Sequence, residues 1–85
     1  MLARDLVKVC DEAVDGGRYV SLVHRGIRRD VYPFRIRDER LYCWCSLHPD
    51  TEVEGMYLSN ISSAVVSDKS VGFLFGYDTD FWTQG

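Results

Sequence analysis

The sequence predicts an α+β domain in which one N-terminal helix packs on a small antiparallel β-barrel. Apolar residues recur at helical spacing through residues 1–16, and from residue 18 onward they alternate with a period of two. Glycine, proline and short polar runs divide the second part into short strands, which is typical of a small barrel. The 85 residues are enough for a single domain with one thin core.

Residues 1–16 are expected to form the helix. Gly16 and Gly17 end it, because glycine adopts the left-handed conformation of a helix C-cap without strain. A helix this short is marginal alone, so its apolar stripe is expected to dock on the rest of the domain. That stripe recurs every three or four positions and comprises Leu2, Leu6, Val9, Cys10 and Ala13.

Residues 18–67 are expected to form the barrel. The first two strands span 18–24 and 27–36, with a tight turn at Arg25-Gly26. Pro33 cannot donate a hydrogen bond to a strand ladder, so it marks an edge, a bulge or a strand end. The later elements are strands at 40–46, 53–58 and 64–66, a polar turn at 37–40, a loop at 48–51 and one helical or 3₁₀ turn at 59–62.

Charge is distributed unevenly along the chain, whose net charge is −3. Residues 18–40 hold seven arginines against three acidic residues, a net charge of +4, whereas residues 41–85 hold Lys69 alone against six acidic residues, a net charge of −5. Such asymmetry bears on partners rather than on fold. The acidic overall balance argues against a non-specific nucleic-acid binder.

Three cysteines, Cys10, Cys43 and Cys45, indicate a reducing and therefore cytoplasmic setting, since an odd number does not form a disulfide framework. No run of 18 or more apolar residues is present, so no membrane span is expected. The first residues also lack the basic and apolar regions of a secretory signal.

The strands over residues 18–66 resemble, in order and spacing, the WYL domain, a small Sm/SH3-like barrel of bacterial transcription regulators. The closest correspondence is Arg29-Asp-Val31-Tyr-Pro33-Phe-Arg-Ile36, which fits the family's Arg-x-Val-x-Pro-x-x-Leu-like stretch. The Trp-Tyr-Leu triplet that names the family falls on Leu41-Tyr42-Cys43, where the tyrosine matches and Trp44 follows. A later family stretch falls on residues 56–61, where Tyr57 and Asn60 replace its two arginines.

This resemblance implies a ligand-sensing or regulatory module rather than an enzyme, with an Sm/SH3-like barrel as its fold. The family's arginines and aromatic residues imply a nucleotide-like or other anionic ligand, or single-stranded nucleic acid, because guanidinium groups bind phosphate and rings stack on bases. Arg29 and Tyr42 are the first candidates for ligand contact, followed by Arg28 and Trp44. Strand alternation places Arg29 on the face of Val31, where an arginine needs a partner.

Two other chemistries are alternatives to ordinary structural roles for the cysteines and histidines. Cys43, Cys45 and His48, with Cys10 as a fourth ligand, suggest zinc, but Cys-x-Cys is not the usual knuckle spacing and core packing of the thiols is favoured. A Cys–His nucleophile pair lacks an oxyanion-hole glycine motif, so no catalytic residue and no cofactor are expected.

The tail over residues 71–85 carries the aromatic residues Phe73, Phe75, Tyr77, Phe81 and Trp82. The sequence predicts a homodimer with residues 71–82 in its interface, because such side chains are costly to expose. The alternative is that the tail folds back over the helix of its own chain. A protein-interaction or oligomerisation module without a small ligand is therefore the alternative function.

Overall fold

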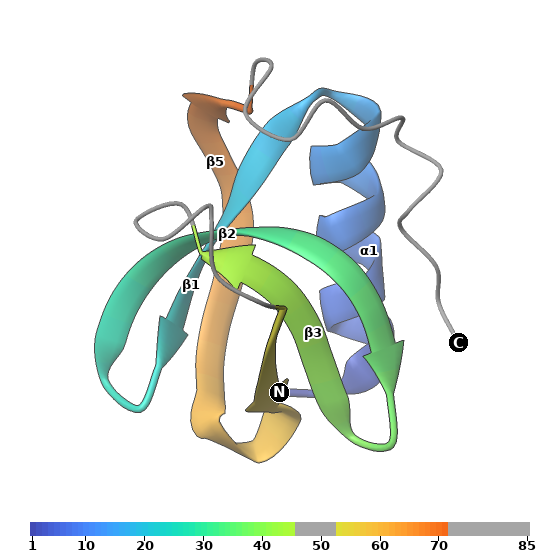
Figure 1. Ribbon diagram of the computed structural model, residues 1–85, viewed down its shortest axis with the longest axis vertical. Helices are drawn as coiled ribbons and strands as arrows, with labels where there is room; N and C mark the ends of the chain where they lie inside the picture. The colour runs from blue at the N-terminus through green and yellow to red at the C-terminus, as the bar shows by residue number, and fades with distance from the viewer. Residues whose placement is uncertain (46–52, 72–85) are drawn as a thin grey trace.

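The computed structural model describes residues 1–45 and 53–71. One helix, α1, packs on a five-stranded antiparallel sheet (Figure 1). The elements are α1 (Ala3–Asp15), β1 (Arg18–His24), β2 (Ile27–Arg37), β3 (Arg40–Cys45), β4 (Glu54–Tyr57), the 3₁₀ turn η1 (Leu58–Asn60) and β5 (Ile61–Ser70). The predicted α+β class is therefore confirmed.

The strand order is β4-β3-β2-β1-β5, so β5 returns to pair with β1 at the far side of the first hairpin. Figure 1 shows that the sheet is strongly curved, with β2 arching across the molecule. Within the described residues, hydrogen bonds do not close this sheet into a barrel, and β4 and β5 form its two edges. The same residues contain no helix with the length and apolar character needed to cross a membrane.

The helix ends as its glycines predict. The N–H of Gly16 donates to the carbonyl of Glu12, and Gly17 follows with a φ of 66°. Leu6, Cys10 and Ala13 of the predicted stripe are fully buried. The first member of the stripe, Leu2, instead precedes the helix and is 59% exposed, because the docked face begins one turn later.

Both tight hairpins turn through residues with positive φ. Arg25 and Gly26 connect β1 to β2, as predicted, with φ values of 51° and 80°. Asp38 and Glu39 connect β2 to β3 with φ values of 54° and 63°. Two consecutive residues with positive φ are the geometry of a type I′ turn, whose twist matches that of the flanking strands.

The two faces of the sheet carry different clusters. The core face packs against α1 and carries the larger cluster, which includes Val20, Leu22, Val31, Leu41, Cys43 and Met56. The opposite face carries a smaller cluster of Tyr19, Tyr32 and Trp44, completed by Val14 from the end of the helix. Phe34, Val53 and Val71 pack against this smaller cluster.

A β-bulge in β2 lies at the proline, one of the three roles predicted for it. Pro33 pairs with Cys43, but the next ladder pair joins Arg35 to Tyr42, so Phe34 is the extra residue. After the bulge, Ile36 takes the core-facing position opposite Leu41. The arginines beside it therefore project from the opposite face.

Parts of the prediction lie outside the described residues. These are the loop at 48–51, the histidine His48 and the aromatic tail after Val71.

Candidate functional site

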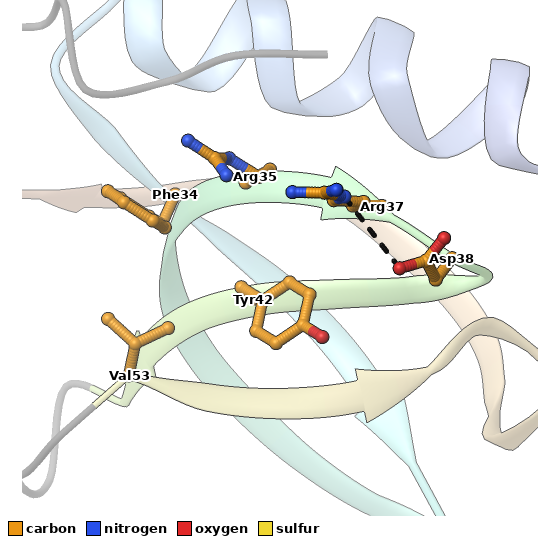
Figure 2. A pocket seen from close by; sticks show the side chains of 6 residues that line it. All are labelled: Phe34, Arg35, Arg37, Asp38, Tyr42 and Val53. Atoms are coloured by element: carbon orange, nitrogen blue, oxygen red, sulfur yellow. Dashed lines mark ion pairs between the residues drawn. The ribbon is translucent and has the colours of Figure 1, made fainter. Parts of the chain in front are cut away.

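A hollow of about 330 Å³ lies on the opposite face of the sheet, beside the second hairpin. Figure 2 shows side chains from β2, the following turn, β3 and the residue before β4 around it. This hollow is called the pocket below. Its lining residues are Phe34, Arg35, Arg37, Asp38, Tyr42 and Val53. This volume is at the small end of the range for ligand sites in proteins.

Strand register positions the functional side chains of the pocket. Arg35 on β2 and Tyr42 on β3 are direct cross-strand partners, and Arg37 pairs with Arg40 two positions further along. Partners in an antiparallel ladder project from the same face of the sheet. The register therefore gathers three guanidinium groups and the Tyr42 ring on one face.

The ring of Tyr42 rests over Gly55, its partner on β4. A Cβ atom at Gly55 would lie only 3.1 Å from Cε1 of Tyr42, which is closer than ordinary van der Waals contact. The glycine thus leaves the space that the ring occupies beside the pocket.

The Arg35 guanidinium lies 5.4 Å from the centroid of the Phe34 ring, within cation–π range. Its Nε atom is buried and has no hydrogen-bond partner in the described part of the chain. Residues 1–45 and 53–71 also contain no ion pair to Arg35. Arg35 therefore presents a positive charge that a bound anion can neutralise.

Arg37 is only weakly paired. Its Nε lies 3.7 Å from Oδ2 of Asp38, and the two side chains are 63% and 80% exposed (Figure 2). Exposed pairs of this kind contribute about 0–1 kcal/mol, so an anion can compete for the guanidinium.

Arg40 extends the cationic and aromatic surface toward β4. Its guanidinium lies 4.5 Å from the centroid of the Tyr57 ring, and Nη2 donates a hydrogen bond to the Tyr57 hydroxyl. Hydrogen bonds with Tyr42 and Tyr57 raise the pKa of Arg40, since they favour the charged guanidinium. The strip beside the pocket therefore remains cationic.

Of the four residues predicted from sequence, only Tyr42 lines the pocket. Trp44 is 8% exposed and packs edge-to-face on Phe34 with ring centroids 5.1 Å apart, so it contacts a lining residue and does not itself line the pocket. Arg28 lies on the same face but further along β2, where Nη1 donates to Oγ of Ser21 at 2.7 Å.

Arg29 lies on the other face of the sheet, as strand alternation predicted. It is the cross-strand partner of the buried Leu22, and its Nη1 lies 2.9 Å from Oε2 of Glu54. His24 shares this environment: burial first, and then the charges of Arg29 and Arg25, lower its pKa, while Glu54 acts in the opposite direction. The structure therefore does not bring Arg29 together with Tyr42.

Arg35 and Arg37, which line the pocket, are not among the ligand-contact residues that the sequence predicts. Uninterrupted alternation would have placed both on the face of Val31. The sequence signal was that Val31 and Ile36 are both apolar but lie an odd number of positions apart. Two such residues can face the same core only if the strand contains a bulge, which lies at Pro33.

The three cysteines are free and buried in the core. Burial raises the pKa of Cys10 to about 12 and also raises that of Cys43, so both are protonated thiols at neutral pH. Sγ of Cys43 lies 3.9 Å from Sδ of Met56. Within the described ranges, no group of three or more His, Cys, Asp or Glu side chains is arranged to hold a metal ion.

Comparisons with known proteins add no family assignment. No protein-family model, curated protein or solved structure matches the chain. The geometry of the pocket is therefore the basis for assigning a function.

Proposed function

We propose that this domain binds a small anionic ligand, nucleotide-like in carrying both a phosphate and a flat ring, in the pocket. One observation supports the proposal above all: the guanidinium groups of Arg35 and Arg37 and the rings of Phe34 and Tyr42 surround a single hollow. Guanidinium forks bind phosphate oxygens bidentately, and aromatic rings provide a stacking surface for a base.

The charge state of the pocket supports an anion over a neutral ligand. Arg35 has no ion pair among the described residues, and Arg37 is held only by an exposed pair with Asp38. The nearby Arg40 adds a third positive charge. Asp38 is the single acidic side chain among the described lining residues, whose net charge is therefore positive.

The proposed fold is a WYL-like small barrel of the Sm/SH3-like type whose seam is not closed by hydrogen bonds. An N-terminal helix, five antiparallel strands in the order β4-β3-β2-β1-β5 and the turn η1 between β4 and β5 support this reading. On this proposal the domain is a sensing module and not an enzyme.

Titration with pyrophosphate, AMP and uncharged adenosine at low salt tests the proposed ligand class. AMP is expected to bind more tightly than adenosine, and added salt is expected to weaken the binding of both anions. Arg35→Ala and Arg37→Ala should each reduce AMP affinity about ten- to hundredfold, since a charge-assisted hydrogen bond contributes about 1.5–3 kcal/mol. NMR shift perturbation also reports whether Tyr42 responds.

Arg28→Ala is the matched control, because it removes one positive charge from the same strand and the same face outside the pocket. It should leave AMP affinity nearly unchanged. Equal losses in all three variants would show a diffuse electrostatic effect, and the absence of binding to either anion would reject the assignment.

The open sheet edges favour a second function, assembly with another protein. Tyr57 on β4 and Val65 on β5 are 46% and 56% exposed, and both lie on edge strands. Edge strands present unpaired N–H and C=O groups that can pair with another chain. Sedimentation velocity over a range of concentrations tests this function, and a monomer throughout would reject homotypic assembly.

A further inference from the structure

A second group of side chains able to bind an anion lies beside the pocket, next to the turn of the second hairpin. Arg37 is the ladder partner of Arg40, and Arg40 is in turn the ladder partner of Tyr57 on β4. Ladder partners project from the same face of a sheet, so these three side chains form a row across β2, β3 and β4. Arg35 and Tyr42 form the neighbouring row, two residues away along the strands. The two rows are therefore about 7 Å apart.

The guanidinium of Arg40 is held by two hydroxyl groups. Nη2 donates to the hydroxyl of Tyr57, whose ring centroid lies 4.5 Å from the guanidinium, and a second side-chain hydrogen bond joins Arg40 to Tyr42. None of the ion pairs within residues 1–45 and 53–71 includes Arg40, and its buried Nε atom has no hydrogen-bond partner there. The positive charge of Arg40 is therefore not compensated by a carboxylate of the described residues.

The hydroxyl groups of Tyr42 and Tyr57 each keep a hydrogen-bond donor. Arginine has donors but no acceptor, so both hydroxyl oxygens accept from Arg40. The hydrogen of each hydroxyl group is then directed away from the guanidinium, where an oxygen atom of an anion can accept it. Tyr57 is 46% exposed, and Figure 2 shows the Tyr42 hydroxyl at the end of the ring nearer the hairpin turn. Arg40 therefore orients two neutral donors beside its own charge.

We propose that Arg37, Arg40 and the Tyr57 hydroxyl form a second anion subsite, and that the ligand is a nucleoside diphosphate. This inference rests on the proposed function, because the second subsite extends the pocket. One phosphate group then lies between Arg35 and Arg37, and the other reaches Arg40 and the Tyr57 hydroxyl. A diphosphate carries more negative charge than a monophosphate, so it gains most from the third guanidinium and from the hydroxyl donor. Arg40 is the residue that distinguishes the two classes of ligand.

Titration of the full chain with AMP and ADP at low salt tests the second subsite. ADP should bind about ten- to hundredfold more tightly than AMP, because its second phosphate gains charge-assisted hydrogen bonds. Arg40→Met should remove most of this preference and leave AMP affinity nearly unchanged. Tyr57→Phe keeps the ring and the net charge, and it should lower ADP affinity several-fold. The control, Arg28→Met, removes one positive charge from the same face outside both rows and should retain the preference for ADP.

The outcomes separate the second subsite from the pocket itself. Equal affinities for AMP and ADP would overturn the second subsite and leave the pocket assignment intact, as would a preference for ADP that survives both Arg40→Met and Tyr57→Phe. Pyrophosphate binding that is lost in Arg40→Met and retained in Arg35→Ala would support the second subsite and reject the proposed function. No binding of AMP, ADP or pyrophosphate would overturn both.

Discussion

The guanidinium of Arg29 on β2 lies 2.9 Å from the carboxylate of Glu54 on β4, although β3 separates these strands in the sheet. Arg29 is the cross-strand partner of the buried Leu22, and Glu54 is the partner of the buried Cys43, so both side chains belong to the core face of the sheet. Backbone ladder hydrogen bonds among the described residues do not join these strands. The ion pair therefore links two strands that are not neighbours in the sheet.

A double-mutant cycle with Arg29→Met and Glu54→Gln measures the strength of this tie. The coupling free energy should be about 0.2–1 kcal/mol and decrease with salt, because the side chains are partly exposed. Urea unfolding gives the four stabilities of the cycle. The same cycle on Lys69 and Asp30, whose charged atoms are 3.8 Å apart, should give a smaller value, and a coupling of zero at Arg29 would contradict the prediction.

Gly55→Ala should weaken ligand binding without a matching loss of stability. The added Cβ would lie 3.1 Å from Cε1 of Tyr42, so the ring must move by a few tenths of an ångström. The free energy of unfolding should change by less than about 1 kcal/mol, because alanine in a strand regains backbone entropy that glycine loses. AMP affinity, measured by titration, should fall several-fold.

Gly17→Ala is the control, because it should lower stability without weakening ligand binding. Gly17 has a φ of 66°, and no atom of the described residues lies within 4 Å of an added Cβ, so alanine there strains the backbone and does not crowd the pocket. It should lower the unfolding free energy by about 1 kcal/mol or more and leave AMP affinity unchanged. Equal effects of the two variants on binding would show that the Tyr42 contact is unimportant.

The periodicity of the sequence predicted most of the fold, because each hydrophobic pattern is local. The helix, its glycine end and the limits of β1 at Arg18 and His24 follow from it directly. The sequence pattern predicts the last strand at 64–66, whereas β5 spans Ile61–Ser70. Its polar residues give a weak strand signal, and pairing with β1 extends the strand through tertiary contacts that propensity does not encode.

The sequence predicted less of the candidate site than of the fold. The partner of Arg29 lies 25 residues away, so only the need for a partner could be predicted, not its identity. Arg35 and Arg37 reach the face of Tyr42 through one extra residue at the bulge. A shift of one residue reverses every side chain that follows, so a site built after a bulge cannot be read from simple alternation.

Glu39→Gly should stabilise the protein. Glu39 has a φ of 63° in the second hairpin turn, a conformation that costs a non-glycine residue about 1–2 kcal/mol. Glycine removes this strain but loses about 0.5–1 kcal/mol of backbone entropy on folding, which leaves a net gain of about 0.5–1 kcal/mol. Urea unfolding measures the gain. The same change at the exposed helical position Glu12 should instead cost about 1 kcal/mol, and a loss at both positions would contradict the argument.

His24 should make stability depend on pH in the range just below its ordinary pKa of about 6.5. Burial, then the charges of Arg29 and Arg25, lower the pKa of the folded state, and Glu54 only partly opposes them. Between the folded and unfolded pKa values the unfolded chain binds more protons, so the unfolding free energy rises with pH. The contribution is fully present above the unfolded pKa and is lost as pH falls toward the folded pKa.

Urea unfolding at about pH 7.5, 6.5 and 5.5 covers this window while most carboxylates remain ionised. His24→Gln should flatten the pH dependence, because glutamine does not titrate. His48→Gln, which replaces the second of the two histidines, is the matched control and should retain the dependence. If the slope disappears in His48→Gln and persists in His24→Gln, the environment of Arg25, Arg29 and Glu54 does not set the acid sensitivity of this domain.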